Sequence, residues 1–447
     1  MSLLPVARRI RNTEPKSAGY WVSSPGELVD LVIESHTARL AKGSAEREMQ
    51  PFFIADLGQV TRQHTCWMQH LPNVRPYYAV KCNSDPILLN WLANLGTGFD
   101  CASMEELCTV LRLNVDPSRI IFSNPCKAPA AMVFAGRVGV TCTIFDNLDE
   151  LDKIKRYLPE AQLLLRIHAS DDSALIPLGD KFGAPLDTTK ELLLRAWELG
   201  LNVVGVSFHI GTGAHNPDSF RHAIHDAQLA FRHAEAIGFH PTTLDIGGGF
   251  QDENFETMAR TVREALADTL SLEITVIAEP GRYYARSAYT LVSQVIGRRR
   301  QIGSASGTPD MLYQNDGVYG NFMNVIMEKE VMAPYLCSRK GRTDSISVSR
   351  STKQGRTGNA PAEGPGPGPG PQPPVGTGEY RYSVWGPTCD STDCVVREAA
   401  FDSEVHVGDW LKYHNMGAYT STTATRFNGF GGKTDVIYIN SEVMPAY

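Results

Sequence analysis

A lysine ends the run Tyr77-Tyr78-Ala79-Val80-Lys81, which is short, apolar, aromatic and β-branched. Such a run is typical of a buried strand. An ammonium group at the end of a buried strand is costly unless it is paired or its nitrogen is bound in an imine. The alternative is a lysine whose aliphatic stem carries the charge out to water. The local sequence favours neither interpretation.

Four later features place polar groups where apolar runs end: His209, the run Gly247-Gly248-Gly249, Glu279 and Arg282. Taken singly, they have structural interpretations, namely a core histidine, a tight turn and an ion pair. Taken together, they suit an aldehyde cofactor that carries a phosphate and a pyridine ring. Glycine N–H groups and an arginine can hold the phosphate, a carboxylate can face the ring nitrogen, and an imidazole can stack on the ring. We therefore interpret Lys81 as the residue that binds such a cofactor covalently.

The composition is that of an ordinary globular protein, with 42% hydrophobic and 20% charged residues in 447. This length predicts two domains, or one large domain with additions. A net charge of -7 gives no general reason to expect nucleic-acid binding. The nine cysteines are scattered without a metal-type CxxC pair, so we expect no metal site and a reducing compartment. No apolar run is long enough for a membrane helix or a secretory signal, so we expect a cytoplasmic protein with no membrane contact.

Short apolar runs alternate with helix-like segments from residue 51 onward. After a lead strand at 52–54, the runs predict eight strands, at 77–81, 98–102, 120–124, 143–146, 163–168, 204–210, 243–247 and 275–279. Alternating strands and helices form parallel sheets, and eight such units predict an α/β fold of the (β/α)8 barrel type. The runs end on the polar or glycine residues Lys81, Asp100, Asn124, Asp146, Arg166, His209, Gly247 and Glu279. These ends form the face on which such barrels build active sites.

The chain divides into four segments. We expect a flexible lead-in at 1–25, a segment at 26–50 that joins a β-rich domain, the barrel at 51–285, and the β-rich domain itself at 286–447. Strands of that second domain are expected at 288–296, 311–313, 383–385, 409–413 and 436–439. Alternating glycine and proline at 364–371 cannot bury a core and predict a disordered insertion at about 338–378. The basic residues just before that run indicate a solvated loop.

Eight motifs together resemble one family. They are YAVKCN (78–83), GFDCAS (98–103), SFHIG (207–211), LDIGGGF (244–250), EPGRYY (279–284), NDGVYG (315–320), WGPTCD (385–390) and NMGAYT (415–420). The chain resembles the eukaryotic ornithine decarboxylases, group IV pyridoxal-phosphate (PLP) decarboxylases with an alanine-racemase-like barrel. The resemblance covers about residues 50–440, except the glycine/proline insertion.

The resemblance implies that PLP is the cofactor and assigns residues to it. Lys81 would bind it covalently, His209 would stack on the ring, and Glu279 would pair with the protonated ring nitrogen. The phosphate would be held by Gly247, Gly248, Gly249, Arg282, Tyr419 and Thr212, the last standing where the family usually has serine. Asp100 and Arg166 belong to the same cofactor-binding set.

The resemblance also implies a homodimer whose active sites are shared across the interface. Cys389 would protonate the substrate carbon after decarboxylation, Asp390 would bind the distal amine, and Phe427 would form a wall of the pocket. Lys181 and Asp393 match a pair that bridges the two subunits.

Two positions depart from the family. Met327 and Glu328 stand where ornithine decarboxylases have an aromatic residue and aspartate. We expect Glu328 to meet the distal amine together with Asp390; its extra methylene favours a shorter substrate, or a longer one if the backbone shifts. Arg426, beside Phe427, either points to solvent or suits a substrate with an extra carboxylate. Both departures resemble enzymes of fungal alkaloid pathways, such as that of loline biosynthesis.

Three functions follow from these observations. The leading one is decarboxylation of L-ornithine to putrescine and CO2. The second is the same chemistry on lysine, arginine, a shorter diamino acid or an alkaloid precursor. The third is a non-catalytic regulator like antizyme inhibitor, which the presence of Lys81, Glu279, Arg282 and Cys389 disfavours, because a dead relative is free to lose them.

Overall fold

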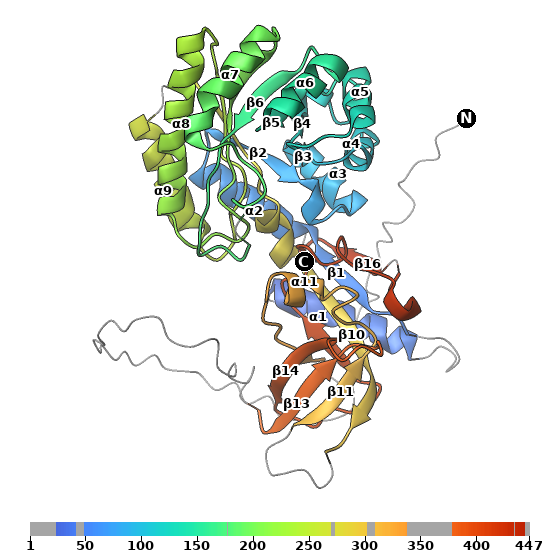
Figure 1. Cartoon of the computed structure of the whole chain (residues 1–447). Coiled ribbons are helices and arrows are strands. Elements are labelled where there is room, and N and C mark those ends of the chain that lie inside the picture. The colour runs from blue at the N-terminus through green and yellow to red at the C-terminus, as the bar shows by residue number, and fades with distance from the viewer. Residues whose placement is uncertain are drawn as a thin grey trace, which may run out of the picture.

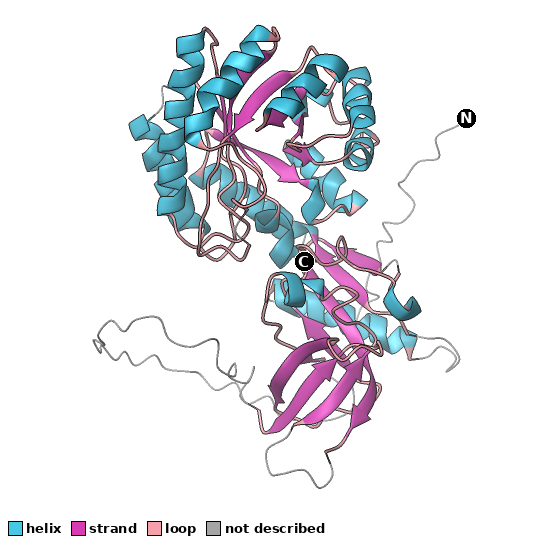
Figure 2. Cartoon of the chain, viewed as in Figure 1, coloured by secondary structure: helices cyan, strands magenta, loops and turns pink. Residues whose placement is uncertain are grey.

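The computed structural model describes residues 24–41, 49–176, 178–269, 273–301, 309–337, 378–432 and 434–442. Within them the chain forms a closed barrel ringed by helices and a second, sheet-rich domain (Figures 1 and 2). The lead-in expected at 1–25 falls almost entirely outside the described residues, and so does the insertion expected at 338–378.

The barrel confirms the predicted fold class. Its eight strands pair in chain order and close through β2 and β9: β2 (Val74–Ala79), β3 (Gly98–Cys101), β4 (Ile120–Phe122), β5 (Cys142–Phe145), β6 (Gln162–Arg166), β7 (Asn202–Ser207), β8 (Thr243–Asp245) and β9 (Thr275–Ala278). Every strand pair is parallel. Ile121, Ile144, Leu164 and Ile277 form an apolar cluster from four of these strands and fill part of the interior.

The helices around the barrel are α2 (Leu57–His70), α3 (Pro86–Leu95), α4 (Met104–Leu111), α5 (Pro129–Arg137), α6 (Leu148–Tyr157), α7 (Thr189–Glu198), α8 (Asp218–Ile237), α9 (Phe255–Thr269) and α10 (Arg282–Ala285). Short 3-10 turns are η2 (Val80–Cys82), η3 (Pro117–Arg119), η4 (Leu186–Thr188), η5 (Arg286–Ala288) and η6 (Phe427–Gly429). Local sequence sets the helix starts. Before α4, Ser103 accepts the N–H of Glu106, and the Glu106 carboxylate accepts the N–H of Ala102 at 2.6 Å. This reciprocal pair of caps begins the helix directly after a barrel strand.

The second domain is built on β1 (Phe52–Asp56), β10 (Tyr289–Arg299), β11 (Asp310–Gln314), β12 (Tyr335–Leu336), β13 (Tyr380–Trp385), β14 (Cys394–Phe401), β15 (Trp410–Tyr413) and β16 (Asp435–Ile439). The sheet order is β12-β15-β10-β11-β13-β14, with β1 paired to β10 and β16. The strand expected to lead the barrel is therefore part of the second sheet. Helix α1 (Pro25–Leu40) packs on it through Val29 and Ile33.

The two domains meet beside the end of β2. Asp85, which caps α3, accepts hydrogen bonds from the hydroxyls of Tyr289 (2.9 Å) and Tyr438 (2.7 Å) of the second domain. The side-chain amide of Asn83 donates to the carbonyl of Gly417 at 2.9 Å. These contacts fix the loop that carries Lys81. No helix in the described part of the chain is long and apolar enough to cross a membrane.

Candidate active site

Lys81 lies in η2 at the mouth of the barrel. Its Nζ donates to Oδ2 of Asp100, on β3, at 2.6 Å, and the other oxygen of Asp100 accepts a hydrogen bond from the hydroxyl of Ser123. The Lys81 side chain is 40% exposed, whereas that of Asp100 is fully buried. Burial lowers the pKa of Lys81, but the Asp100 carboxylate, with Glu279, outweighs that effect and raises it. Lys81 is therefore a paired cation at the barrel mouth, with part of its side chain exposed.

Two further buried acids lie close to this pair. Burial raises the pKa of Asp245 to about 6, although the carboxylate accepts hydrogen bonds from the N–H of Gly247 (2.9 Å) and the hydroxyl of Ser207 (3.1 Å). Burial, and then the charges of Asp100 and Asp245, raise the pKa of Glu279 well above its ordinary value. A cation beside Glu279 favours its charged form, and Lys81 and Arg166 already act in that direction. A protonated pyridine nitrogen is a partner of that kind.

The imidazole of His209 is neutral. Burial, followed by the positive charges of Arg166 and Lys81, lowers its pKa well below its usual value. Its Nδ1 accepts the N–H of Gly211 at 3.1 Å, which places the ring proton on Nε2. A Cβ on Gly248 would stand only 2.7 Å from that Nε2, so the glycine lets the ring approach the loop after β8.

The glycine run after β8 is shaped by its backbone. Gly247 has φ +63°, and a Cβ there would lie 2.2 Å from the carbonyl of Phe208; Gly249 has φ +112°. Only glycine takes such positions without strain. Gly247 gives its N–H to Asp245, so of the three predicted phosphate donors it is the one already engaged. The N–H groups of Gly248 and Gly249 are those left for an anion.

Arg282 begins α10 and is buried, with 3% exposed. Among the described residues, its Nε and Nη1 have no hydrogen-bond partner. Buried donors without acceptors cost free energy, and an anion placed against them would remove that cost. The residues present therefore fit the phosphate of PLP.

Glu328 is buried and pairs with Arg282, its Oε1 lying 2.5 Å from Arg282 Nη2. The expected contact of this carboxylate with the substrate's distal amine stays a prediction. The residue follows α11 (Met323–Met327) of the second domain. A buried carboxylate needs a counter-charge, and Arg282 is the one it reaches.

The other predicted cofactor residues surround the same mouth. Tyr419 has φ +54°, donates its N–H to the carbonyl of Cys82 at 3.0 Å, and holds its ring 5.2 Å from the Arg282 guanidinium. Arg166 ends β6 and lies over the ring of Phe182 at 5.3 Å. Thr212 follows β7 and pairs through its backbone with Ile176.

The predicted substrate residues form a second group, in the sheet-rich domain. Asp390 accepts a hydrogen bond from the hydroxyl of Tyr319 at 2.7 Å, and the ring of Phe427 lies 4.5 Å from that of Tyr319. Cys389 is exposed, and its N–H donates to Asn428 Oδ1 at 3.1 Å. Hydrogen bonds from the N–H of Thr392 and from Tyr319 lower the pKa of Asp390, which is anionic at neutral pH. Exposed Arg426 precedes Phe427.

The loop that carries Cys389 is held by Asp393. This residue is 1% exposed and accepts hydrogen bonds from the N–H of Val318 (2.8 Å) and from the N–H (3.0 Å) and hydroxyl (2.7 Å) of Thr388. Because its carboxylate is buried in its own chain, Asp393 has a structural role here. The expected pair with Lys181 of a second subunit stays a prediction.

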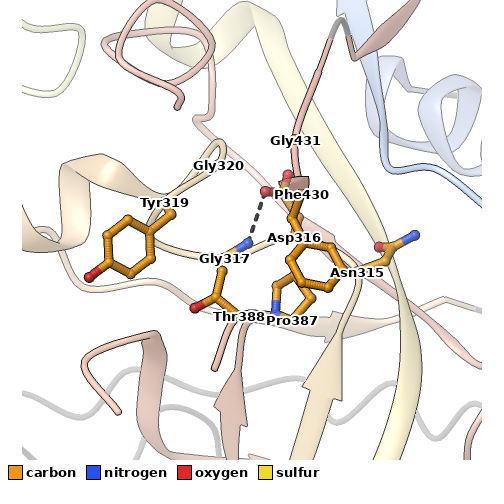
Figure 3. A pocket seen from close by; sticks show the side chains of 9 residues that line it. All are labelled: Asn315, Asp316, Gly317, Tyr319, Gly320, Pro387, Thr388, Phe430 and Gly431. Carbon is orange, nitrogen blue, oxygen red and sulfur yellow. Dashed lines mark hydrogen bonds between the residues drawn. The ribbon is translucent and has the colours of Figure 1, made fainter. Parts of the chain in front are cut away.

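A small pocket lies beside this loop rather than at the barrel mouth (Figure 3). In that view Tyr319 lies on one side and Asn315 and Phe430 on the other, with Thr388 below. Asp316 accepts the N–H of Gly317 at 2.9 Å, and burial raises its pKa to about 6. The pocket is part of the support of the Cys389 loop and contains none of the residues expected to do chemistry.

Sequence reasoning missed Ser123, Asp245 and Tyr319 as site residues. Ser123 and Asp245 lie at strand ends, and Tyr319 lies in the motif NDGVYG. Their positions in the sequence could therefore have identified them as candidate site residues. The described residues hold no group of three or more His, Cys, Asp or Glu side chains arranged for a metal ion.

The mouth of the (β/α)8 barrel combines a lysine paired with a buried acid, a neutral histidine, a glycine cradle and an arginine with unused donors. This set of groups suits a PLP-type cofactor. Residues 57–286 match the family model described as pyridoxal-dependent decarboxylase, pyridoxal binding domain. The chain belongs to the ornithine decarboxylase family of pyridoxal-dependent decarboxylases.

Individual relatives agree with that assignment. The chain is 44% identical to the ornithine decarboxylase of Neurospora crassa, over 88% of this chain and 81% of the relative. It is 38% identical to the decarboxylase flvG of Aspergillus flavus, over 92% and 91%. Among solved structures, it is similar to the Paramecium bursaria Chlorella virus arginine decarboxylase, with a TM-score of 0.79 and 33% identity over 92% of this chain and 100% of the viral one.

Proposed function

We propose that this chain decarboxylates L-ornithine to putrescine and CO2, with PLP as cofactor, as a cytoplasmic homodimer. The observation that carries the proposal is the intact set of charged groups at the barrel mouth, Lys81 with Asp100 and buried Glu279, on a chain 44% identical to an ornithine decarboxylase. Among the hypotheses drawn from the sequence, a non-catalytic regulator is disfavoured because these groups are present and paired.

The barrel residues bind and orient. Lys81 would hold the cofactor covalently, Arg282 and the N–H groups of Gly248 and Gly249 would hold its phosphate, and Glu279 would keep a proton on the ring nitrogen. When bound, the cofactor supplies the electron sink for the carbanion left when CO2 departs. Asp100 keeps Lys81 positioned through the 2.6 Å contact.

The second group of residues completes the reaction. The Cys389 thiol would donate a proton to the carbon that has lost CO2. Asp390, held anionic by Thr392 and Tyr319, would bind the distal ammonium of ornithine through a charge-assisted hydrogen bond. Phe427 would pack against the aliphatic part of the substrate.

A second copy of the chain would cover the exposed group. Cys389 is exposed and 43% of Phe427 is exposed, which does not suit a chemical step that must exclude water. In a two-fold dimer, the Cys389 loop of one subunit would close the barrel mouth of the other, and the same contact would occur twice.

The test is CO2 release by purified protein supplied with PLP and a panel of L-ornithine, L-lysine, L-arginine and 2,4-diaminobutyrate. We expect the highest kcat/KM with ornithine. A higher value with another member of the panel would assign the same chemistry to that substrate. Release from none of them would contradict the proposal and favour a regulator.

A further inference from the structure

Arg282 and Glu328 form a buried ion pair that leaves polar atoms unused. Their side chains are 2% and 3% exposed, and Arg282 Nη2 and Glu328 Oε1 are 2.5 Å apart. Within the described part of the chain, Arg282 Nε and Nη1 and Glu328 Oε2 have no hydrogen-bond partner. A structural ion pair at this depth normally satisfies its remaining donors and acceptors. Each partner therefore retains polar atoms that can bind a further group.

Glu330, two residues further along the chain, differs from Glu328 in having hydrogen-bond partners for both of its oxygens. Glu330 accepts hydrogen bonds from Arg286 Nε (3.2 Å) and from the side-chain amide of Asn324 (2.6 Å). Both of its oxygens are therefore engaged, and Arg286 has further acidic partners in Asp252 and Glu253. Of these two acids, Glu328 is the one that pairs with Arg282, the arginine that faces the cofactor site.

We propose that Glu328 is an internal counter-ion that competes with the cofactor phosphate for Arg282. A phosphate seated on Nε and Nη1 and a carboxylate on Nη2 would share one cation in a pocket largely shielded from water. Two anions that contact the same guanidinium group repel each other strongly where the dielectric is low. Phosphate binding must therefore displace the carboxylate or neutralise it, and either event lowers the affinity of the site for the cofactor.

The length of the side chain is central to this competition. Glutamate has one methylene more than aspartate, and that methylene extends the reach of the carboxylate toward Arg282. Burial raises the pKa of Glu328 and the charge of Arg282 opposes the rise, so the arginine stabilises the charged form of the acid. The inference rests on the proposed function in one respect, namely that the bound anion is the phosphate of PLP.

The experiment compares PLP with pyridoxal, which lacks the phosphate, as ligands of the full chain depleted of cofactor. Binding is followed by the absorbance of the ligand attached to Lys81. We expect Glu328→Gln to lower the Kd for PLP about tenfold, the scale of one charge-assisted contact, and to leave the Kd for pyridoxal unchanged. Glu330→Gln, the matched control, should change neither value.

Several results would overturn the inference. An unchanged or higher Kd for PLP in Glu328→Gln would mean that the carboxylate orients Arg282 instead of competing for it. Equal tightening of pyridoxal would place the effect away from the phosphate. Should Glu328→Gln fail to fold, Glu328→Asp must shift the Kd for PLP in the same direction by a smaller factor. A wild-type chain that binds no PLP would contradict the proposed function as well, whereas normal binding without a Glu328 effect contradicts this inference alone.

Discussion

Replacing Asp245 by asparagine should remove a specific pH dependence of stability from the cofactor-free protein. Asp245 is fully buried, and burial raises its pKa from 3.8 to about 6. A difference of this size corresponds to about 3 kcal/mol of free energy of unfolding. Asparagine preserves the shape, and its amide oxygen can still accept the N–H of Gly247.

The sign follows from which state binds the proton more tightly. Well below pH 3.8, its ordinary pKa, the acid is protonated in both the folded and the unfolded chain. As the pH rises toward 6, the unfolded chain releases the proton first, so the folded state loses stability over this window. The stability of Asp245→Asn relative to wild type should therefore grow by up to about 3 kcal/mol between pH 4 and pH 6.5 and stay constant above it. The neighbouring Glu279 should also ionise more easily, because one of the charges that raise its pKa is gone.

The assay is the difference in melting temperature between variant and wild type, measured by differential scanning fluorimetry at half-unit steps from pH 4 to pH 7.5. Ser207→Ala is a control of opposite sign. It removes the 3.1 Å hydrogen bond that favours the charged carboxylate, so it should raise the pKa of Asp245 further and steepen the loss of stability. Parallel pH profiles for wild type and Asp245→Asn would refute the reasoning, since the carboxyl would then carry no raised pKa.

Three further predictions concern the site. Lys81→Ala should abolish the covalent label that borohydride leaves when it fixes PLP to the protein, together with nearly all turnover; a label on Lys127, which is buried against Glu150, would contradict the assignment. Mixing Lys81→Ala with Cys389→Ala under conditions of subunit exchange should restore about a quarter of wild-type activity, because half of the dimers are mixed and each rebuilds one of two sites; no recovery would contradict a shared site. Asp393→Ala should destabilise the sheet-rich domain by about 1–3 kcal/mol, because buried donors of Val318 and Thr388 lose their acceptor, and should lower kcat while PLP absorbance persists; unchanged kcat and melting temperature would show that Asp393 does not hold the loop.

Most of the barrel could be predicted from sequence because its information is local. Each strand is a short apolar run between helical segments, and parallel strands buried on both faces keep that pattern without long-range help. The run at Phe52–Asp56 looks the same and yet belongs to the second sheet. Its partners are β10 and β16, more than two hundred residues further along the chain. The residues of the run itself do not indicate which strands it pairs with.

The positions of the site residues on barrel strands could be predicted from sequence, whereas those of Glu328 and Asp393, in the second domain, could not. Lys81, His209, Glu279 and Arg282 could be singled out because the end of a barrel strand fixes where such a side chain must lie. Glu328 could not be placed in this way, because it comes from the second domain and its partner depends on how α11 meets the barrel. The same holds for Asp393, whose burial follows from a loop folding around its carboxylate.

The charges of the cofactor site are balanced by the chain itself. Lys81 is paired with Asp100 and Arg282 with Glu328, and burial, with the charges of Asp100 and Asp245, raises the pKa of Glu279. PLP, bound as we propose, would bring a phosphate to Arg282, a cationic ring to Glu279 and an aldehyde to Lys81. Internal pairing lets the fold form without leaving bare charges in a poorly hydrated pocket. On our proposal the cofactor would bind by exchanging partners, so its affinity would depend on the strength of the pairs it replaces as well as on the contacts it makes.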